Sequence, residues 1–146
     1  MVDPSAEVNP FVAEFKAKKQ KIRDDVFVNC TEVEKAIMIL HLLGFAAQQI
    51  IETGIVCNNI YLFISIGLEI SEADMGLNQH SVNILRNVCH NTSKVMSLYL
   101  TDLTNANIAA QEIFSSLRVF YSQIRETPNY TDFLRDTIKR VEHLRN

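Results

Sequence analysis

The stretch of sequence that decides the fold runs from Ala36 to Ile70 and reads AIMILHLLGFAAQQIIETGIVCNNIYLFISIGLEI. It contains no Lys or Arg, and its only acidic residues are Glu52 and Glu69. A helix that is apolar nearly all round is normally buried against other elements. We therefore expect this stretch to supply either a shared core or an interface.

The first half of the stretch belongs to a helix predicted over 32–53. Thr31 and Glu34 have the spacing of a capping box, and Gly54 suits the left-handed position that ends a helix. Polar side chains such as Glu34 and His41 recur seven residues apart and leave one narrow wet stripe. The other positions are mostly apolar, so the sequence predicts a helix at the centre of the fold.

The second half, residues 55–71, fits two patterns. As a helix it carries one polar stripe, and as a strand it alternates apolar side chains from Ile60 to Ile70. A strand needs a partner, and the only other run typical of a strand is the short 26–28. We therefore favour a helix here and keep a strand as the alternative.

The rest of the chain shows helical signals. A first helix is expected after Asn9, with Pro10 in its first turn, and it should end near Asp25. Apolar positions then recur at alternating steps of three and four over 79–103 and 106–125. A final helix is expected after Pro128, over about 131–145.

These patterns predict an all-α fold. Long helices joined by short loops are typical of a compact antiparallel bundle, here of five or six helices. No repeat or linker divides residues 1–146, so we expect one domain, with 1–9 as a loose N-terminal segment.

Composition and charge exclude several functional classes. The apolar fraction of 47% and the charged fraction of 21% are those of a globular protein. A net charge of −3 argues against a nucleic-acid partner. The three cysteines form no CxxC pair, and the N-terminus shows no secretory signal, so we expect a cytoplasmic setting. Membrane insertion is not favoured, because the clean apolar runs within 36–70 are shorter than the ~20 residues that spanning needs.

No pattern for catalysis or cofactor binding is present. His41 interrupts an apolar helix and is the one seed for a ligand or proton-transfer site, although a structural place on the wet stripe is the expected role. Cys89 and His90 are adjacent and would point about 100° apart on a helix, so they predict a core thiol and a solvent-facing imidazole. We expect no enzyme activity, no metal and no cofactor.

Two linear features near the N-terminus are candidates for binding. The tripeptide Asn9-Pro10-Phe11 resembles the NPF ligand of endocytic EH domains, but helix capping accounts for Asn9 and Pro10. Lys16, Lys19 and Arg23 would share one face of the first helix, where they could contact an anionic partner or lipid.

The function that the sequence favours is a non-enzymatic protein–protein interaction module. Two helices as apolar as those of 36–70 are hard to hide in so small a bundle, and the excess surface would form a homodimer interface or a groove for a partner helix. The alternatives are a membrane-surface regulator, which uses this hairpin or the basic face of the first helix, and a small helical enzyme seeded at His41. The predicted interface residues are Leu40, Leu43, Ala47, Ile51, Ile60, Phe63 and Ile64.

Overall fold

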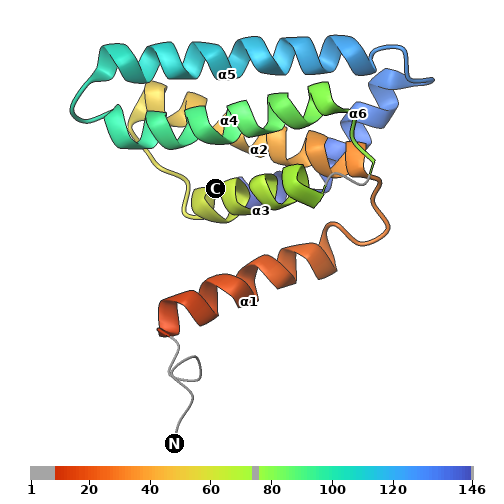
Figure 1. Cartoon of the computed structure of the whole chain (residues 1–146), viewed down its shortest axis with the longest axis horizontal. Coiled ribbons are helices and arrows are strands. Elements are labelled where there is room, and N and C mark those ends of the chain that lie inside the picture. Colours follow the sequence, from red (N-terminus) through yellow and green to blue (C-terminus); the bar gives the residue numbers. More distant parts are fainter. Residues whose placement is uncertain (1–8, 74–75, 146) are drawn as a thin grey trace, which may run out of the picture.

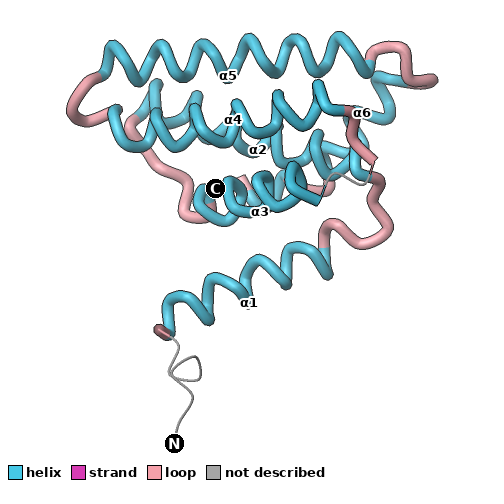
Figure 2. Tube along the Cα trace, viewed as in Figure 1, coloured by secondary structure: helices cyan, strands magenta, loops and turns pink. Residues whose placement is uncertain are grey.

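The structure is a computed structural model that describes residues 9–73 and 76–145. Those residues form helices and no strand, so the all-α bundle is confirmed (Figure 2). The helices are α1 (Pro10–Asp25), α2 (Glu32–Thr53), α3 (Ile60–Ala73), α4 (Gln79–Leu98), α5 (Leu103–Ile124), α6 (Tyr130–Lys139) and a short 3₁₀ turn, η2 (Glu142–Leu144).

The predicted caps of the first two helices are confirmed. Asn9 caps α1, because its side chain accepts a hydrogen bond from the Phe11 N–H at 2.9 Å. At the start of α2, Thr31 and Glu34 form both hydrogen bonds of the capping box, each 3.1 Å long. Gly54 ends α2 at a φ of 73°, which an L side chain rarely adopts.

The segment 55–71 is helical from Ile60 onward, so the favoured helix is confirmed and the strand alternative is wrong. The first helical hydrogen bond of α3 runs from the Phe63 N–H to the Asn59 carbonyl at 3.1 Å. Residues 55–59 form a loop whose turn lies at Asn58 and Asn59. A helix predicted from 55 is therefore too early by five residues.

Two later boundaries also differ from expectation. The helix predicted over 79–103 ends at Leu98, because Asp102 caps the next helix by accepting from the Asn105 N–H at 3.1 Å. Leu103 therefore belongs to α5. The helix predicted over 131–145 ends at Lys139, and the 3₁₀ turn follows it. The loose segment predicted over 1–9 lies outside the described residues except for Asn9.

The helices pack around α2 (Figure 1). α2 contacts α3, α4, α5 and α6, while α4 lies alongside α5, and α1 contacts α3. In Figure 1, α5 and α1 lie at opposite margins of the bundle, with α2, α3 and α4 between them. Buried apolar side chains from each of α1 to α5 belong to one cluster, and partly buried side chains of α6 pack against it. This arrangement leaves the far side of α5 and the N-terminal half of α1 as outer surfaces.

Candidate functional site

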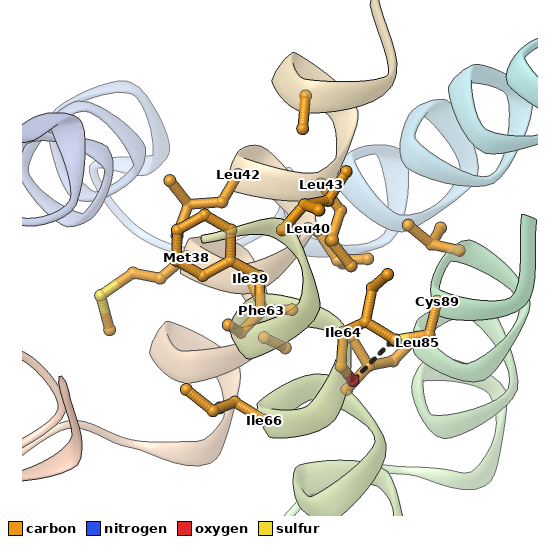
Figure 3. Close-up of a cluster of buried hydrophobic side chains, with 14 of the residues drawn as sticks. Met38, Ile39, Leu40, Leu42, Leu43, Phe63, Ile64, Ile66, Leu85 and Cys89 are labelled. Atoms are coloured by element: carbon orange, nitrogen blue, oxygen red, sulfur yellow. Dashed lines mark hydrogen bonds between the residues drawn. The ribbon is translucent and has the colours of Figure 1, made fainter. Parts of the chain in front are cut away.

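The residues predicted to form an interface lie in the core of the single chain. Ile51 is half-buried, and the other six predicted residues are buried. Figure 3 shows several of them packed around α3: Leu40 and Leu43 from α2, with Phe63 and Ile64 from α3. A surface that is already covered by neighbouring helices is not free to receive a partner.

The helix α2 is also the one described helix that is long and apolar enough to cross a membrane by length and composition. Most of that apolar stretch is buried inside the bundle. Its hydrophobicity is therefore accounted for by its central position among α3, α4, α5 and α6.

Two of the three predicted anionic contacts are already paired within the chain. Lys19 of α1 donates to a carboxylate oxygen of Glu69 on α3 at 2.6 Å, and Arg23 forms a second ion pair with the same carboxylate. Lys19 also donates to the hydroxyl of Ser65 at 3.1 Å. Lys16 is exposed. Lys19 and Arg23 therefore tether α1 to the bundle.

His41 lies under the C-terminal turn of the chain. Burial lowers its pKa, the nearby Arg145 lowers it further, and Glu142 opposes the shift. The Nε2 atom of His41 is buried without a hydrogen-bond partner, and Arg145 stacks its guanidinium 4.3 Å from the centre of the Phe45 ring. These contacts explain a neutral imidazole between α2 and the C-terminal turn.

The other titratable groups do not gather into a metal site in the part of the chain that the structure describes. No group of three or more His, Cys, Asp or Glu side chains there could hold an ion. Cys89 is fully buried, and burial raises its pKa to about 12, while His90 is exposed. The Cys89 thiol donates to the Ile64 carbonyl at 3.7 Å (Figure 3), so it is a core residue, as predicted.

The strongest candidate for a binding surface is the outer face of α5. Thr104, Ile108, Gln111, Ser115 and Val119 are all exposed and recur at steps of three and four. These steps place them on one side of the helix. The opposite side is the one that packs on the bundle, through buried residues including Ala106, Ala110, Ile113 and Phe120. We call the exposed set of residues the outer seam of α5 and the buried set the inner seam. The inner seam packs on the bundle, and the outer seam faces solvent.

The outer seam carries little charge. Between Asp102 and Arg118 the sequence contains a single charged residue, Glu112. Ile108 and Leu103 are each 55% exposed, and Val119 is 45% exposed. Surface helices of soluble proteins normally carry charged residues on their outer face. A long uncharged face with open aliphatic side chains is typical of a surface that meets another protein.

A hollow runs along the same face. It has a volume of about 710 Å³ and opens widely to solvent between α5 and the edge of α4. Asn87 of α4 lines the hollow and donates a hydrogen bond to the Ser116 hydroxyl at 2.7 Å. Ile108, Ser115 and Ser116 line it from α5. Small serine side chains beside an aliphatic one leave room for side chains of a second helix.

A second, smaller apolar patch lies where the start of α1 meets the start of α3. Phe11 is 79% exposed, and Tyr61 and Val12 are also open. Phe11, Phe15 and Tyr61 line one shallow pocket there, together with Lys18. The Phe11 ring of the NPF tripeptide is thus open to solvent, while the Asn9 side chain is engaged in capping.

The chain matches no model of a known protein family, no curated protein and no solved structure. The sequence did contain the signal for the α5 face. Its outer positions repeat at steps of three and four just as the inner ones do, but they are mostly polar, so a search for apolar seams passes over them.

Proposed function

We propose that the chain is a non-enzymatic protein–protein interaction module that binds through the outer face of α5. The exposure of the outer face of the 22-residue helix α5, on which Glu112 is the one charged residue between Asp102 and Arg118, carries this proposal. The 36–70 hairpin is not the contact surface in this proposal, because its apolar residues are used in the core. The partner is another helical protein or a second copy of the chain.

The physical basis is the balance between burial and desolvation. Covering Ile108, Leu103 and Val119 removes apolar surface from water, at about 25 cal/mol for each Å². The Asn, Gln, Ser and Thr side chains around them can hydrogen-bond to a partner, and they cost less to desolvate than charged groups. Such a face suits reversible association, since non-obligate interfaces combine an apolar centre with polar surroundings.

The test compares two matched substitutions. Ile108→Glu places a charge in the centre of the proposed surface, and Ile55→Glu places the same charge on the α2–α3 loop, where the wild-type side chain is 58% exposed. Proteins that bind the purified wild-type chain from a cell extract are identified, purified and titrated against all three forms. We expect Ile108→Glu to weaken binding at least tenfold and Ile55→Glu to leave it unchanged. Equal affinities for the three forms would remove α5 as the contact surface.

A second candidate function, attachment to a membrane surface, is supported by the patch at the start of α1. Phe11, Val12 and Tyr61 are open to solvent beside the exposed Lys16 and Lys18. Aromatic and aliphatic side chains flanked by lysines suit the interface of an anionic bilayer. Sedimentation with vesicles containing phosphatidylserine tests it: wild-type chain should pellet at low salt, and Phe11→Ser should not. No pelleting at low salt would exclude this candidate.

We place the module in a reducing, cytoplasmic setting as part of the same proposal. Its three cysteines are free thiols, and two of them, Cys57 and Cys89, are buried in the core. Free thiols are typical of proteins in reducing compartments.

A further inference from the structure

We infer that residues 142–145 form a pH-sensitive latch, which covers one side of α2 at neutral pH and lifts away when His41 takes up a proton. The inference concerns a surface other than the outer face of α5, so it does not depend on the proposed function. It is carried by the way these residues meet His41 and Phe45 of α2.

The latch meets α2 through the side chain of Arg145. The guanidinium of Arg145 lies 4.3 Å from the centre of the Phe45 ring. His41 lies one helical turn before Phe45, so the two side chains share one side of α2. Both are half-buried, whereas Leu42, Leu43 and their apolar neighbours are buried in the core. Arg145 therefore lies over the partly open side of α2.

The closed latch buries polar atoms that have no hydrogen-bond partner. The Nε2 atom of His41 and the Nε atom of Arg145 are both in this position. Burying such an atom is unfavourable, because its hydrogen bonds to water are lost and not replaced. The stacking of Arg145 on Phe45 and the packing of the half-buried Leu144 oppose this cost. Lifting the latch would return both polar atoms to water.

The latch is attached less firmly than the residue before it. Val141 is fully buried and anchors the chain, but none of the described residues 142–145 is buried. The hydrogen bonds that shape the turn are local: the Leu144 N–H donates to the Val141 carbonyl at 2.9 Å, and the Arg145 N–H to the Glu142 carbonyl at 3.2 Å. Segments with few buried contacts open at a lower free energy than the core. The latch can therefore open beyond Val141 while the helices stay folded.

Protonation of His41 places a positive charge under the latch, beside a second one. Burial is the largest cause that lowers the pKa of His41, Arg145 lowers it further, and Glu142 opposes them. Both charged groups that act on the imidazole thus belong to the latch. Arg140, which follows α6, lies 3.5 Å from the carboxylate of Glu34 on α2 and is neutralised there. The protonated imidazole is therefore disfavoured chiefly while the latch is closed.

Acidification opens the latch because the open state binds the proton more tightly. With the latch open, the imidazole is in water and its pKa has the ordinary value of about 6.5. With the latch closed, the pKa of His41 is lower. Above about pH 6.5 the imidazole is neutral in both states, and pH has no effect. Below it, each pH unit favours the open state about tenfold until the closed-state pKa is reached.

The opening can be followed with a single tryptophan. The chain contains no Trp, so Phe45→Trp places one fluorescent reporter under Arg145, and an indole keeps the stacking with the guanidinium. Emission and acrylamide quenching are measured from pH 7.5 to 4.5, with far-UV circular dichroism on the same samples. We expect emission to shift to longer wavelength and quenching to rise below pH 6.5, while the dichroism still reports full helix content. Emission that stays constant, or that changes only together with the dichroism, would overturn the inference.

Two matched histidine variants of the Phe45→Trp chain assign the proton. His41→Gln should abolish the shift in emission. His143→Gln removes an exposed histidine from the latch itself and should leave the shift unchanged. A shift that persists in His41→Gln, or one that is lost in His143→Gln, would show that His41 is not the group that opens the latch.

Glu142→Gln gives a test that leaves α2 unchanged. Glu142 is exposed, and its carboxylate raises the pKa of His41 in the closed state. Without that carboxylate the protonated imidazole is disfavoured more strongly under the closed latch, so the change in emission should move to higher pH. Emission at pH 7.5 should match that of the Phe45→Trp parent, whereas a merely structural role of Glu142 would alter it there. A change that stays at the same pH or moves to lower pH would contradict the mechanism.

Discussion

Gly67 of α3 lies at the tightest approach between α3 and its neighbours, and its replacement by alanine should destabilise the fold. A Cβ atom at this position would lie 2.7 Å from the Cys89 sulfur, 3.0 Å from a methyl carbon of Ile39 and 3.7 Å from one of Leu85. The first two distances are shorter than normal contacts, so α3 would have to move away from both α2 and α4. Alanine in place of glycine within a helix otherwise stabilises by about 1 kcal/mol.

The magnitude follows from which neighbours can yield. Cys89 and Ile39 are fully buried, and Ile39 is β-branched with one preferred rotamer in a helix. Overpacking of such a site costs about 1–3 kcal/mol, which exceeds or cancels the propensity gain. We expect Gly67→Ala to lower the free energy of unfolding by about 1–2 kcal/mol, with a fall in Tm of about 2–4 °C for each kcal/mol.

Gly44 of α2 supplies the matched control. A Cβ there would lie 2.6 Å from the end of the Leu117 side chain and meet no other side chain that closely. Leu117 is only half-buried, so it can rotate aside. Gly44→Ala should therefore be neutral or stabilising by up to about 1 kcal/mol, which is opposite in sign to Gly67→Ala.

Urea unfolding followed by circular dichroism measures both variants. The double variant Gly67→Ala/Cys89→Ala removes the closest clashing atom, so it should recover at least about 1 kcal/mol relative to the sum of the single changes. A Gly67→Ala protein as stable as wild type, or a double variant with purely additive effects, would refute the close packing of α3 against α4.

Three further changes test other contacts. Glu69→Gln should lower the free energy of unfolding by less than about 1 kcal/mol, since the ion pairs with Lys19 and Arg23 are partly exposed. It should nevertheless speed amide hydrogen exchange in α1. Unchanged exchange would show that these pairs do not tether α1. Thr31→Ala should lower the free energy of unfolding by about 1 kcal/mol, because the α2 cap is lost. Thr31→Ser keeps the capping hydroxyl and should retain most of the wild-type stability. Equal urea midpoints for all three forms would disprove this. The lowered pKa of His41 means that below about pH 6.5 the unfolded chain binds a proton there that the folded chain does not, so stability is lost as pH falls from 6.5 through the folded pKa. His41→Gln should reduce the loss measured between pH 7.5 and 5.0, and an equal loss in both proteins would argue against a buried neutral imidazole.

The helices were predictable where local chemistry determines them. The caps at Asn9 and Thr31 and the left-handed Gly54 are set by side chains within a few residues, so the limits of α1 and α2 could be predicted from the sequence. The start of α3 and the end of α4 could not, because apolar periodicity continues through the loops that follow Gly54 and precede Asp102. Tertiary packing and a downstream cap determined those limits.

The candidate site was harder to predict than the fold. The high hydrophobicity of 36–70 suggested that some of its apolar surface would remain exposed. That expectation would be correct if only a few helices surrounded α2. In the structure four helices contact α2, and α3 is itself contacted by α1, α2 and α4, so both apolar helices are covered. Hydropathy alone reports that a segment is buried and does not report whether its own chain or a partner buries it.

A surface that is free to bind a partner is therefore better sought on a helix whose other face already packs in the core. In α5 the inner seam, from Ala106 to Phe120, supplies the core contacts, and the outer seam, with Ile108 and Val119, is exposed. A helix that needed only solvent on that side would gain solubility from charged residues there, yet only Glu112 is charged between Asp102 and Arg118. The outer face of α5 is exposed and carries little charge, whereas the apolar residues of α2 are buried in the core. We therefore seek the partner at α5 rather than at the more hydrophobic α2.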